Sequence, residues 1–471
     1  MTNVLFLFSD EHRRDAMGCA GHSLVRTPHL DALADRGTRF TNAMTPSPIC
    51  VPARAALAAG EYVHATRCWS NAQAYAGNPT SWGHRLQKTG HRVDSIGKLH
   101  YRGSRFENGF DRELLPMYIR GEQGWVKGLL RNHELALDCS EYATMVGPSD
   151  STYTDYDLGV TAAACDWLRD SDNTTSDAPW ALFVSWLRPH YPLHCPPDLY
   201  DLYPLDDLDD PLATADPTTE HPVVQTLRRN FDFDRYFTDE TRRMARASYF
   251  ALCTFLDAQI GRVLAALESS GHAEDTIVIY TSDHGDHNGD RGLWTKMTLF
   301  EESAGIPMIV AGPDVPSGME VGTPTSLVDI RPTILSGMNV ADDGRTRPGV
   351  ALQEIATSPD HDRAVLSEYH DGGSPTGMFS LRTTRWKYNA YAGHEPELYD
   401  LDNDPDEQVD LASHPDHVGD RAECEKLLAD IVDVERANTL AFSDQADRIE
   451  ELGGEQAILD AFEFDFTPVG S

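Results

Sequence analysis

The sequence predicts an α/β fold. Three short apolar runs, each long enough for one buried strand and each followed by polar side chains, occupy residues 4–8, 180–186 and 276–280. Such runs are typical of strands that a parallel sheet buries on both faces. Residues 156–168 and about 238–268 have helical periodicity and lie between the runs along the chain. Strands that alternate with helices in this way indicate helices packed on a sheet.

The chain is strongly acidic, with 471 residues and a formal net charge of −36 at pH 7. Its 40% hydrophobic and 24% charged residues are ordinary for an enzyme of two or three domains. Such a surface repels nucleic acid and anionic membranes, so a site for an anion needs local positive charge or a metal. Only six residues are lysine. The composition favours a halophilic, salt-adapted protein, and an ordinary acidic bacterial protein remains the alternative.

The eight cysteines form no Cys-x-x-Cys pair and have no regular spacing, which argues against a disulfide framework or a zinc module. The apolar run at residues 4–8 is too short for a signal-peptide core and has no basic leader. No later run approaches about 20 apolar residues, the length of a membrane span. We therefore expect a cytoplasmic protein with reduced thiols and no membrane partner.

Polar side chains follow the first and third of the predicted strands. Asp10 and Glu11 come directly after the first strand, and Asp283 and His284 come shortly after the third. The carboxyl ends of strands are where α/β proteins place their sites. Asp10, Asp283 and His284 together would suit a hard divalent cation. A helix cap after the first strand and a polar loop after the third are the alternatives.

The segment at residues 45–60 predicts a helix with a cysteine just ahead of it. Pro52 fits a first helical turn, the alanine-rich run at residues 53–59 favours helix, and Gly60 is a natural stop. Cys50 would then lie where free N–H groups and the helix dipole attract anions. Arg54, about one turn on, can add a fixed positive fork for a tetrahedral oxyanion. A small buried cysteine is the alternative interpretation.

Further basic side chains follow the other predicted strands. Lys98 and His100 end the strand at residues 91–96, and two positions apart on a strand extension they point the same way. His190 lies between two prolines after the second apolar run, which suits a positioned acid. Lys296 lies downstream of Asp283. These side chains are candidates for stabilising and protonating an anionic centre.

The texture of the sequence changes after about residue 355. Several short strand-like runs lie between residues 363 and 401, and a helical pattern covers about 417–438. We therefore expect two domains, an α/β catalytic domain at 1–355 and an α+β subdomain at 356–471, with an antiparallel sheet and a closing helix. Residues 101–150 read as an irregular insertion, and residues 200–240 as a solvated excursion. The acidic tail, with alternating phenylalanines, either joins a homo-oligomer or packs on its own domain.

Several of these motifs resemble those of the type I, formylglycine-dependent sulfatases of the alkaline phosphatase superfamily. The resemblance rests on Cys-x-Pro-x-Arg at 50–54, Gly-Lys-x-His at 97–100, Pro-His-x-Pro at 189–192 and the segment at 281–296. It extends from Asp10 to about Leu411. The Asp-His form of the segment that contains His284 is closest to the branch of choline-sulfatases and phosphonate monoester hydrolases.

The resemblance implies an alkaline-phosphatase-like mixed sheet between helices. It implies that a formylglycine-generating enzyme oxidises Cys50 to formylglycine, whose hydrate is the nucleophile. One divalent cation, Ca²⁺ or on the phosphonate branch Mn²⁺, is implied at Asp10, the modified Cys50, Asp283 and His284, and Glu11 is an open fifth ligand. The implied catalytic residues are Cys50, Arg54, Lys98, His100, His190, Asp283 and Lys296.

The leading interpretation is a sulfuric ester hydrolase that cleaves a small-molecule sulfate monoester. The alternative in the same mechanistic class is a phosphonate monoester or phosphodiester hydrolase, and a third is a non-catalytic relative that binds anions or metal. Trp69, Asn71 and Glu368 are candidate substrate-binding residues. An aromatic face and a carboxylate can hold a quaternary ammonium, so a cationic alcohol such as choline is one hypothesis and core packing of these side chains is the other.

Overall fold

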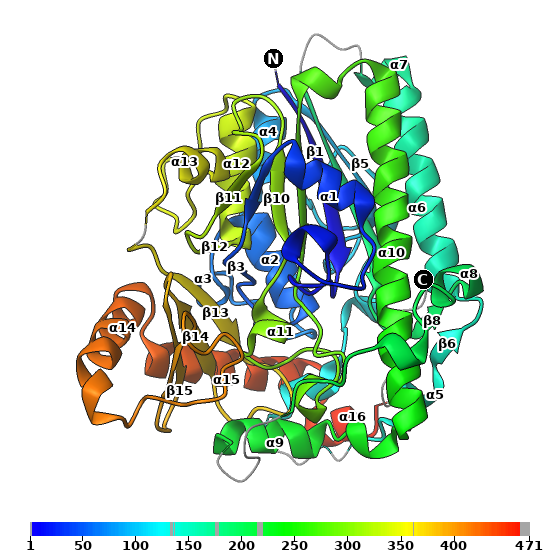
Figure 1. Ribbon diagram of the computed structural model, residues 1–471. Coiled ribbons are helices and arrows are strands. Elements are labelled where there is room, and N and C mark those ends of the chain that lie inside the picture. Colours follow the sequence, from blue (N-terminus) through cyan, green and yellow to red (C-terminus); the bar gives the residue numbers. More distant parts are fainter. Residues whose placement is uncertain are drawn as a thin grey trace.

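A computed structural model of the chain describes residues 2–131, 135, 137–174, 179–213, 220–360 and 362–461. An eight-stranded sheet crosses the larger part of the molecule (Figure 1). Its strands lie in the spatial order β11 (Met319–Val321), β2 (Thr38–Phe40), β10 (Met308–Ala311), β9 (Thr276–Ser282), β1 (Asn3–Asp10), β7 (Trp180–Pro189), β4 (Arg92–Lys98) and β5 (Arg112–Met117).

The sheet is mixed, as expected, because β10 pairs antiparallel with both β9 and β2. The other neighbouring strands run parallel to one another. The apolar run of β1 is buried on both faces, since Phe6 and Phe8 join one hydrophobic cluster while Leu5 and Leu7 join another. The prediction of a strand buried on both faces, made from this continuous apolar run, is therefore confirmed.

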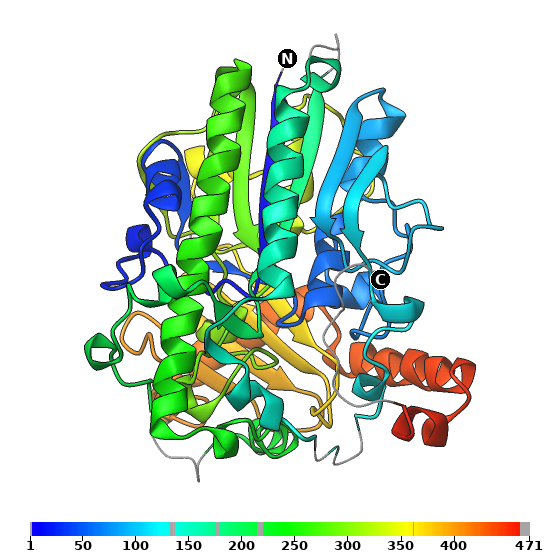
Figure 2. The same ribbon diagram turned by 90° about the vertical axis from the view of Figure 1, so that its right-hand side faces the viewer.

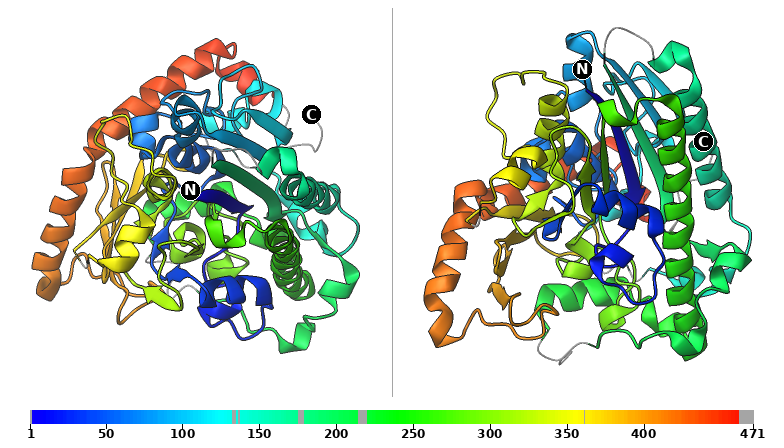
Figure 3. Two further views of the ribbon diagram at one scale, coloured as in Figure 1. Left: turned by 90° about the horizontal axis from the view of Figure 1, so that it is seen from above. Right: turned by 45° about the horizontal axis from the view of Figure 1, so that its top comes forward.

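Helices cover both faces of this sheet, as the view from above shows (Figure 3). The face of Leu5 and Leu7 packs against α1 (Pro28–Asp35), α6 (Thr152–Arg169) and α10 (Asp239–Ser270), and the last two stand side by side in Figure 2. The face of Phe6 and Phe8 packs against α2 (Cys50–Ala59), α4 (Trp82–Lys88), α12 (Ile330–Gly337) and α13 (Leu352–Thr357).

Helix α10 is long and apolar enough to cross a membrane by length and composition. In the structure, 78% of its most apolar window is buried inside the molecule. Its buried leucines and isoleucine pack against the sheet through the same cluster as Leu5 and Leu7. This is the packing of a core helix.

A second, four-stranded antiparallel sheet follows, as predicted. It consists of β13 (Val365–Tyr369), β14 (Met378–Arg382), β15 (Trp386–Tyr391) and β16 (Glu397–Asp400). The single closing helix predicted at 417–438 is wrong, because two helices occupy this region, α14 (Val418–Ile431) and α15 (Val434–Glu451). Val432 is extended, and the Asp433 side chain caps α15 by accepting from the Arg436 N–H at 3.0 Å.

The domain limit predicted at 355/356 falls inside α13, and the two-domain division stays a prediction. The acidic tail from residue 462 lies outside the described residues, so its expected role in an oligomer also stays a prediction. Residues 200–240 are not the purely solvated excursion that their composition suggested. Among the described residues there, Val223, Leu227, Phe231 and Phe233 belong to a hydrophobic cluster.

The remaining strands form two small parallel pairs, and the remaining α-helices are short. The pairs are β3 (Ala43–Met44) with β12 (Thr325–Ser326), and β6 (Val146–Pro148) with β8 (Leu193–Cys195). The helices are α3 (Val63–Thr66), α5 (Ser140–Thr144), α7 (Ser171–Thr174), α8 (Pro197–Tyr200), α9 (Pro222–Asn230), α11 (Glu301–Ala304) and α16 (Glu455–Leu459).

A buried ion cluster joins the four-stranded sheet to helix α11. Lys387 on β15 has no exposed side-chain surface, and its Nζ lies 3.0 Å from Glu301 Oε1 and 2.8 Å from Glu407 Oε1. Glu301 begins α11, which follows the third apolar strand of the large sheet. Lys387 therefore neutralises carboxylates from both parts of the chain.

We expect Lys387→Met to lower the free energy of unfolding by about 3–5 kcal/mol, because it removes the cation paired with the buried Glu407 carboxylate, while Glu301 keeps Arg14. Urea denaturation followed by circular dichroism measures this change. Lys426→Met on the exposed face of α14 is the matched control, and its effect should stay within about 0.5 kcal/mol. Equal, small effects of the two substitutions would contradict the structural role of Lys387.

Candidate active site

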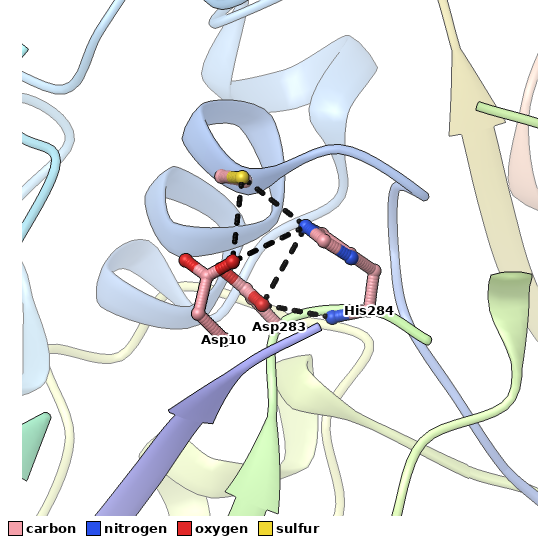
Figure 4. A group of neighbouring side chains, drawn as sticks. Asp10, Asp283 and His284 are labelled. Atoms are coloured by element: carbon pink, nitrogen blue, oxygen red, sulfur yellow. Dashed lines mark hydrogen bonds and ion pairs between the residues drawn. The ribbon is translucent and has the colours of Figure 1, made fainter. Parts of the chain in front are cut away.

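The side chains that follow β1 and β9 meet at one edge of the large sheet. The two strands are parallel neighbours, and Ser9 pairs with Ser282, so Asp10 and Asp283 leave the sheet side by side. Figure 4 shows Asp10, Asp283 and His284 pointing toward one another. Helix α2 begins beside them at Cys50. The predicted convergence of these motifs is therefore what the structure shows.

Four donor atoms surround a common point in this buried cluster. Cys50 Sγ lies 3.1 Å from His284 Nε2 and 3.8 Å from Asp10 Oδ1. His284 Nε2 lies 3.9 Å from Asp10 Oδ1 and 3.6 Å from Asp283 Oδ1. Ligand atoms of all four residues lie within 4.8 Å of one another. The residues are those that the sequence predicted as metal ligands.

The imidazole of His284 is held for ligation. Its Nδ1 lies 3.0 Å from the Gly285 carbonyl, which can only accept, so Nδ1 carries the proton and the lone pair is on Nε2. A second hydrogen bond of this kind is what orients metal-binding histidines. The Nε2 atom is the one that faces the carboxylates.

Two basic side chains hold the outer oxygens of the carboxylates. Arg54 donates from Nε to Asp283 Oδ2 at 2.8 Å and from Nη2 to Asp10 Oδ2 at 3.1 Å. Lys98 Nζ lies 2.5 Å from Asp10 Oδ2. The Oδ1 atoms are thereby turned to the common point. Two carboxylate oxygens, one imidazole nitrogen and the group at position 50 are a donor set that fits one divalent cation.

The charges around Asp10 favour its ionised form. Burial alone raises the pKa of this carboxyl, but the charges of Lys98, His190 and Arg54 together hold it well below its ordinary value. Burial raises the pKa of the Cys50 thiol to about 12. The side chain at position 50 is therefore protonated as a thiol, while Asp10 beside it is a carboxylate.

Arg54 is held mainly by other protein groups, and its oxyanion role stays a prediction. Besides the two carboxylates, its Nη1 donates to the Lys98 carbonyl at 2.8 Å and to Ser185 Oγ at 3.1 Å. All three nitrogens of the guanidinium are thus engaged, and its relative exposure is 1%. Arg54 therefore orients Asp10 and Asp283.

The start of the helix that contains Cys50 also differs from the prediction. Helix α2 begins at Cys50, with Ile49 as its extended N-cap, so Cys50 is in the first turn and Pro52 is its third residue. Gly60 ends the helix in the left-handed conformation with φ 68°, as its residue type predicted. The Cys50 side chain still lies at the positive end of the helix.

A second group of side chains adjoins the first. His190 Nε2 lies 3.2 Å from Glu11 Oε2 and 3.8 Å from Asp10 Oδ1. Lys296 Nζ lies 3.0 Å from the same Glu11 oxygen. Glu11 Oε1 is buried and has no hydrogen-bond partner among the described residues. Glu11 thus links Lys296 to His190, and its place as a fifth metal ligand remains a prediction.

His100 follows β4 and is 7% exposed. Its backbone N–H donates to the Met117 carbonyl at 2.8 Å. Burial, together with the charges of Lys98 and Arg54, lowers the pKa of the imidazole well below its ordinary value. A neutral imidazole in this position can accept a proton.

Asn71 lies beside helix α2, and its side chain accepts a hydrogen bond from the first turn of that helix. Its Oδ1 accepts from the Val51 N–H at 3.1 Å, one of the N–H groups left free at the start of α2. Its own N–H donates to Asp371 Oδ2 at 2.8 Å. Asn71 therefore holds the turn that contains Cys50. No local sequence pattern predicts that Asp371, 300 residues away, accepts from the backbone of this loop.

The substrate-facing rim predicted from Trp69 and Glu368 is wrong. Both side chains are fully buried. The Trp69 indole donates to Asp444 Oδ2 at 2.7 Å and packs edge-on against His370. Glu368 Oε1 accepts from the N–H and the Nδ1 of His64 at 3.2 and 2.8 Å. These contacts tie helices α3 and α15 to β13 and leave no face for a substrate.

The sheet and its edge cluster of carboxylates, histidine and cysteine define a hydrolase of the alkaline phosphatase superfamily. The sulfatase family profile matches residues 2–340, and a second profile, of the C-terminal region of N-sulphoglucosamine sulphohydrolase, matches residues 289–433. The chain belongs to the sulfatase family.

Named relatives agree with this placement. The chain is 32% identical over 433 residues to the choline-sulfatase of Rhizobium meliloti (strain 1021), covering 88% of this chain and 83% of the relative. It is equally 32% identical over 472 residues to arylsulfatase K of Danio rerio, covering 92% and 84%. The protein is therefore a sulfatase-type enzyme.

Solved structures agree in fold. The phosphonate monoester hydrolase of Agrobacterium radiobacter superposes with a TM-score of 0.73 at 25% identity, covering 91% of this chain and 95% of that one. A 2-O GAG sulfatase superposes with a TM-score of 0.74 at 22% identity, covering 99% of both chains, which shows the fold. The resemblance to the sulfatases, and within them to choline-sulfatases and phosphonate monoester hydrolases, is confirmed.

Proposed function

We propose that this sulfatase cleaves a sulfate monoester to an alcohol and inorganic sulfate, with formylglycine at position 50 and one divalent cation. The observation that carries the proposal is the position of Cys50 Sγ, 3.1 Å from His284 Nε2 and within the cluster of carboxylates at the start of α2. An oxygen nucleophile formed there would lie among the cation's ligands.

The proposal requires a bound divalent cation and a modified side chain at position 50. A divalent cation held by Asp10, Asp283, His284 and position 50 would lower the pKa of a hydroxyl and polarise the sulfate oxygens. A hydrated aldehyde at position 50, made from Cys50 by a formylglycine-generating enzyme, supplies one hydroxyl for attack and a second for release of sulfate. Ca²⁺ is the proposed ion, and Mn²⁺ is the alternative.

The remaining residues divide into charge stabilisers and proton carriers. Lys98 and Lys296 stabilise the negative charge that develops on the transferred group. His190, in its doubly protonated form with Nε2 beside Glu11, gives the Nε2 proton to the leaving alcohol. His100, kept neutral by its surroundings, accepts the proton of the second hydroxyl. Arg54 and Asn71 act indirectly, by holding the carboxylates and the first turn of α2.

A phosphonate monoester or phosphodiester is the second candidate substrate. The observation that favours it is the likeness to phosphonate monoester hydrolases of two organisms, with TM-scores of 0.73 and 0.74. A phosphonate monoester and a phosphodiester each carry one negative charge, as a sulfate monoester does, so the charge of the site does not choose between them. The sulfatase family profile and the sulfatase relatives are what support the sulfate monoester.

The test is a panel of esters with one leaving group. Protein co-produced with a formylglycine-generating enzyme is assayed with 4-nitrophenyl sulfate, a 4-nitrophenyl phosphonate and bis(4-nitrophenyl) phosphate. We expect kcat/KM for the sulfate to exceed that for either phosphorus ester by about tenfold, roughly 1.4 kcal/mol of transition-state binding. A phosphorus ester that is the better substrate would replace the first proposal by the second.

The alcohol half of the substrate is a separate question. Choline-sulfatase and arylsulfatase K relatives are equally similar, so neither name decides it. Because Trp69 and Glu368 are buried, we expect similar kcat/KM for choline sulfate and a neutral sulfate ester of the same size. A strong preference for choline sulfate would mean that other residues recognise a quaternary ammonium.

A further inference from the structure

A fully buried arginine lies two residues before His190. Arg188 is near the end of β7 and has no exposed surface. Its guanidinium donates to three backbone carbonyls, those of His190 at 3.0 Å, Pro192 at 2.6 Å and His194 at 3.0 Å. These carbonyls alternate along the turn, so one planar group fixes five consecutive residues, 190–194.

The same guanidinium is tied to helix α6. Its Nη2 donates to Ser151 Oγ at 2.7 Å and to Thr154 Oγ1 at 2.9 Å, at the start of that helix. Asp157, one turn further, accepts from the backbone N–H groups of Leu187 and Arg188 at 2.8 and 2.9 Å. The turn after β7 is thus anchored to the first turns of α6 from two sides.

Because Arg188 holds this turn, the imidazole of His190 is held as well. The Tyr191 carbonyl, which Arg188 leaves free, accepts from His190 Nδ1. Nε2 is therefore the atom that faces Glu11 Oε2 at 3.2 Å and Asp10 Oδ1 at 3.8 Å. If the turn relaxed, the Tyr191 carbonyl would move, and the hydrogen-bonded ring of His190 would move with it, so that Nε2 would no longer face Glu11 and Asp10.

We propose that Arg188 is a positioning residue for His190, which holds the turn so that Nε2 faces the leaving group. This inference rests on the proposed role of His190 as the acid. All five acceptors of Arg188 are neutral oxygens. The planar arrangement of the guanidinium N–H groups, and not an ion pair, therefore holds the turn. Lysine keeps the charge but cannot reach five acceptors in one plane.

A positioning role predicts a loss that depends on the leaving group. Protonation matters little for 4-nitrophenolate and much for a poorer leaving group such as phenolate. We expect Arg188→Lys to lower kcat on phenyl sulfate at least about tenfold more than on 4-nitrophenyl sulfate, with KM changed far less. His190→Ala should show the same pattern with a larger difference. Thr154→Val, which removes one acceptor, should shift the same ratio in the same direction by less.

The matched control is Arg331→Lys. Arg331 is also fully buried and donates to the carbonyls of Ala59 and Thr80 at 3.4 and 2.7 Å, away from His190. Its replacement should affect the two esters equally. Equal losses on both esters in Arg188→Lys and Thr154→Val would overturn the inference, and so would equal losses in His190→Ala. If the unaltered enzyme cleaved neither sulfate, the proposed function itself would fail.

Discussion

Cys50→Ala is expected to leave less than about 1% of the turnover of the unaltered enzyme and an unchanged fold. The substitution removes the side chain of α2 whose sulfur lies among Asp10, Asp283 and His284. No nucleophile can then form at position 50. Alanine fits the first turn of a helix that is already rich in alanine, so thermal unfolding should change little.

The control for this prediction is Cys68→Ala. Cys68 is also buried, but it packs in the hydrophobic cluster of the large sheet. Its loss should cost some stability and leave kcat/KM nearly unchanged. A folded Cys50→Ala protein with several per cent of the original activity would mean that the nucleophile is elsewhere.

Removal of the cation has the second-largest expected effect. Asp10 and Asp283 face one point with their Oδ1 atoms, and a divalent cation there would offset their mutual repulsion in addition to Arg54 and Lys98. We expect a chelator to abolish turnover and lower Tm, and Ca²⁺ or Mn²⁺ to restore both. Elemental analysis should find one ion per chain, and Asp283→Ala should remove it. A metal-free enzyme that keeps full turnover would refute the site.

The strands, and the polar residues that follow them, could be predicted because short stretches of sequence determine them. The apolar run of β1 identified a strand buried on both faces, and polar residues after β1 and β9 converge because parallel neighbours end at one edge. Asp10, Asp283 and His284 followed from that rule alone. To predict their contact with Cys50, one further element was needed, the start of helix α2.

The wrong predictions concern side chains whose environment comes from distant chain segments. Trp69 beside Asn71 has the same sequence context whether it lies on a rim or in a core. Asp444, from α15, decides the matter by accepting the indole N–H. In sequence, Arg54 likewise resembles an anion-binding group, whereas in the structure four of its five N–H groups contact Asp10, Asp283, Ser185 and the Lys98 carbonyl.

The C-terminal region shows a third kind of limit. The helical pattern continues across Val432 and Asp433, so the sequence predicted one closing helix where two form. An aspartate in a helical pattern is equally compatible with an exposed helix face and with an N-cap. Packing of α14 on the small sheet fixes where the first helix stops.

Mass spectrometry of position 50 tests the central claim most directly. The tryptic peptide of residues 40–54 contains Cys50 as its single cysteine. In active preparations we predict that its side chain has exchanged the thiol for an aldehyde, with loss of sulfur and two hydrogens and gain of one oxygen. Across preparations with different extents of conversion, turnover per chain should rise in proportion to the aldehyde fraction. Full turnover by protein that contains only the thiol would contradict the account.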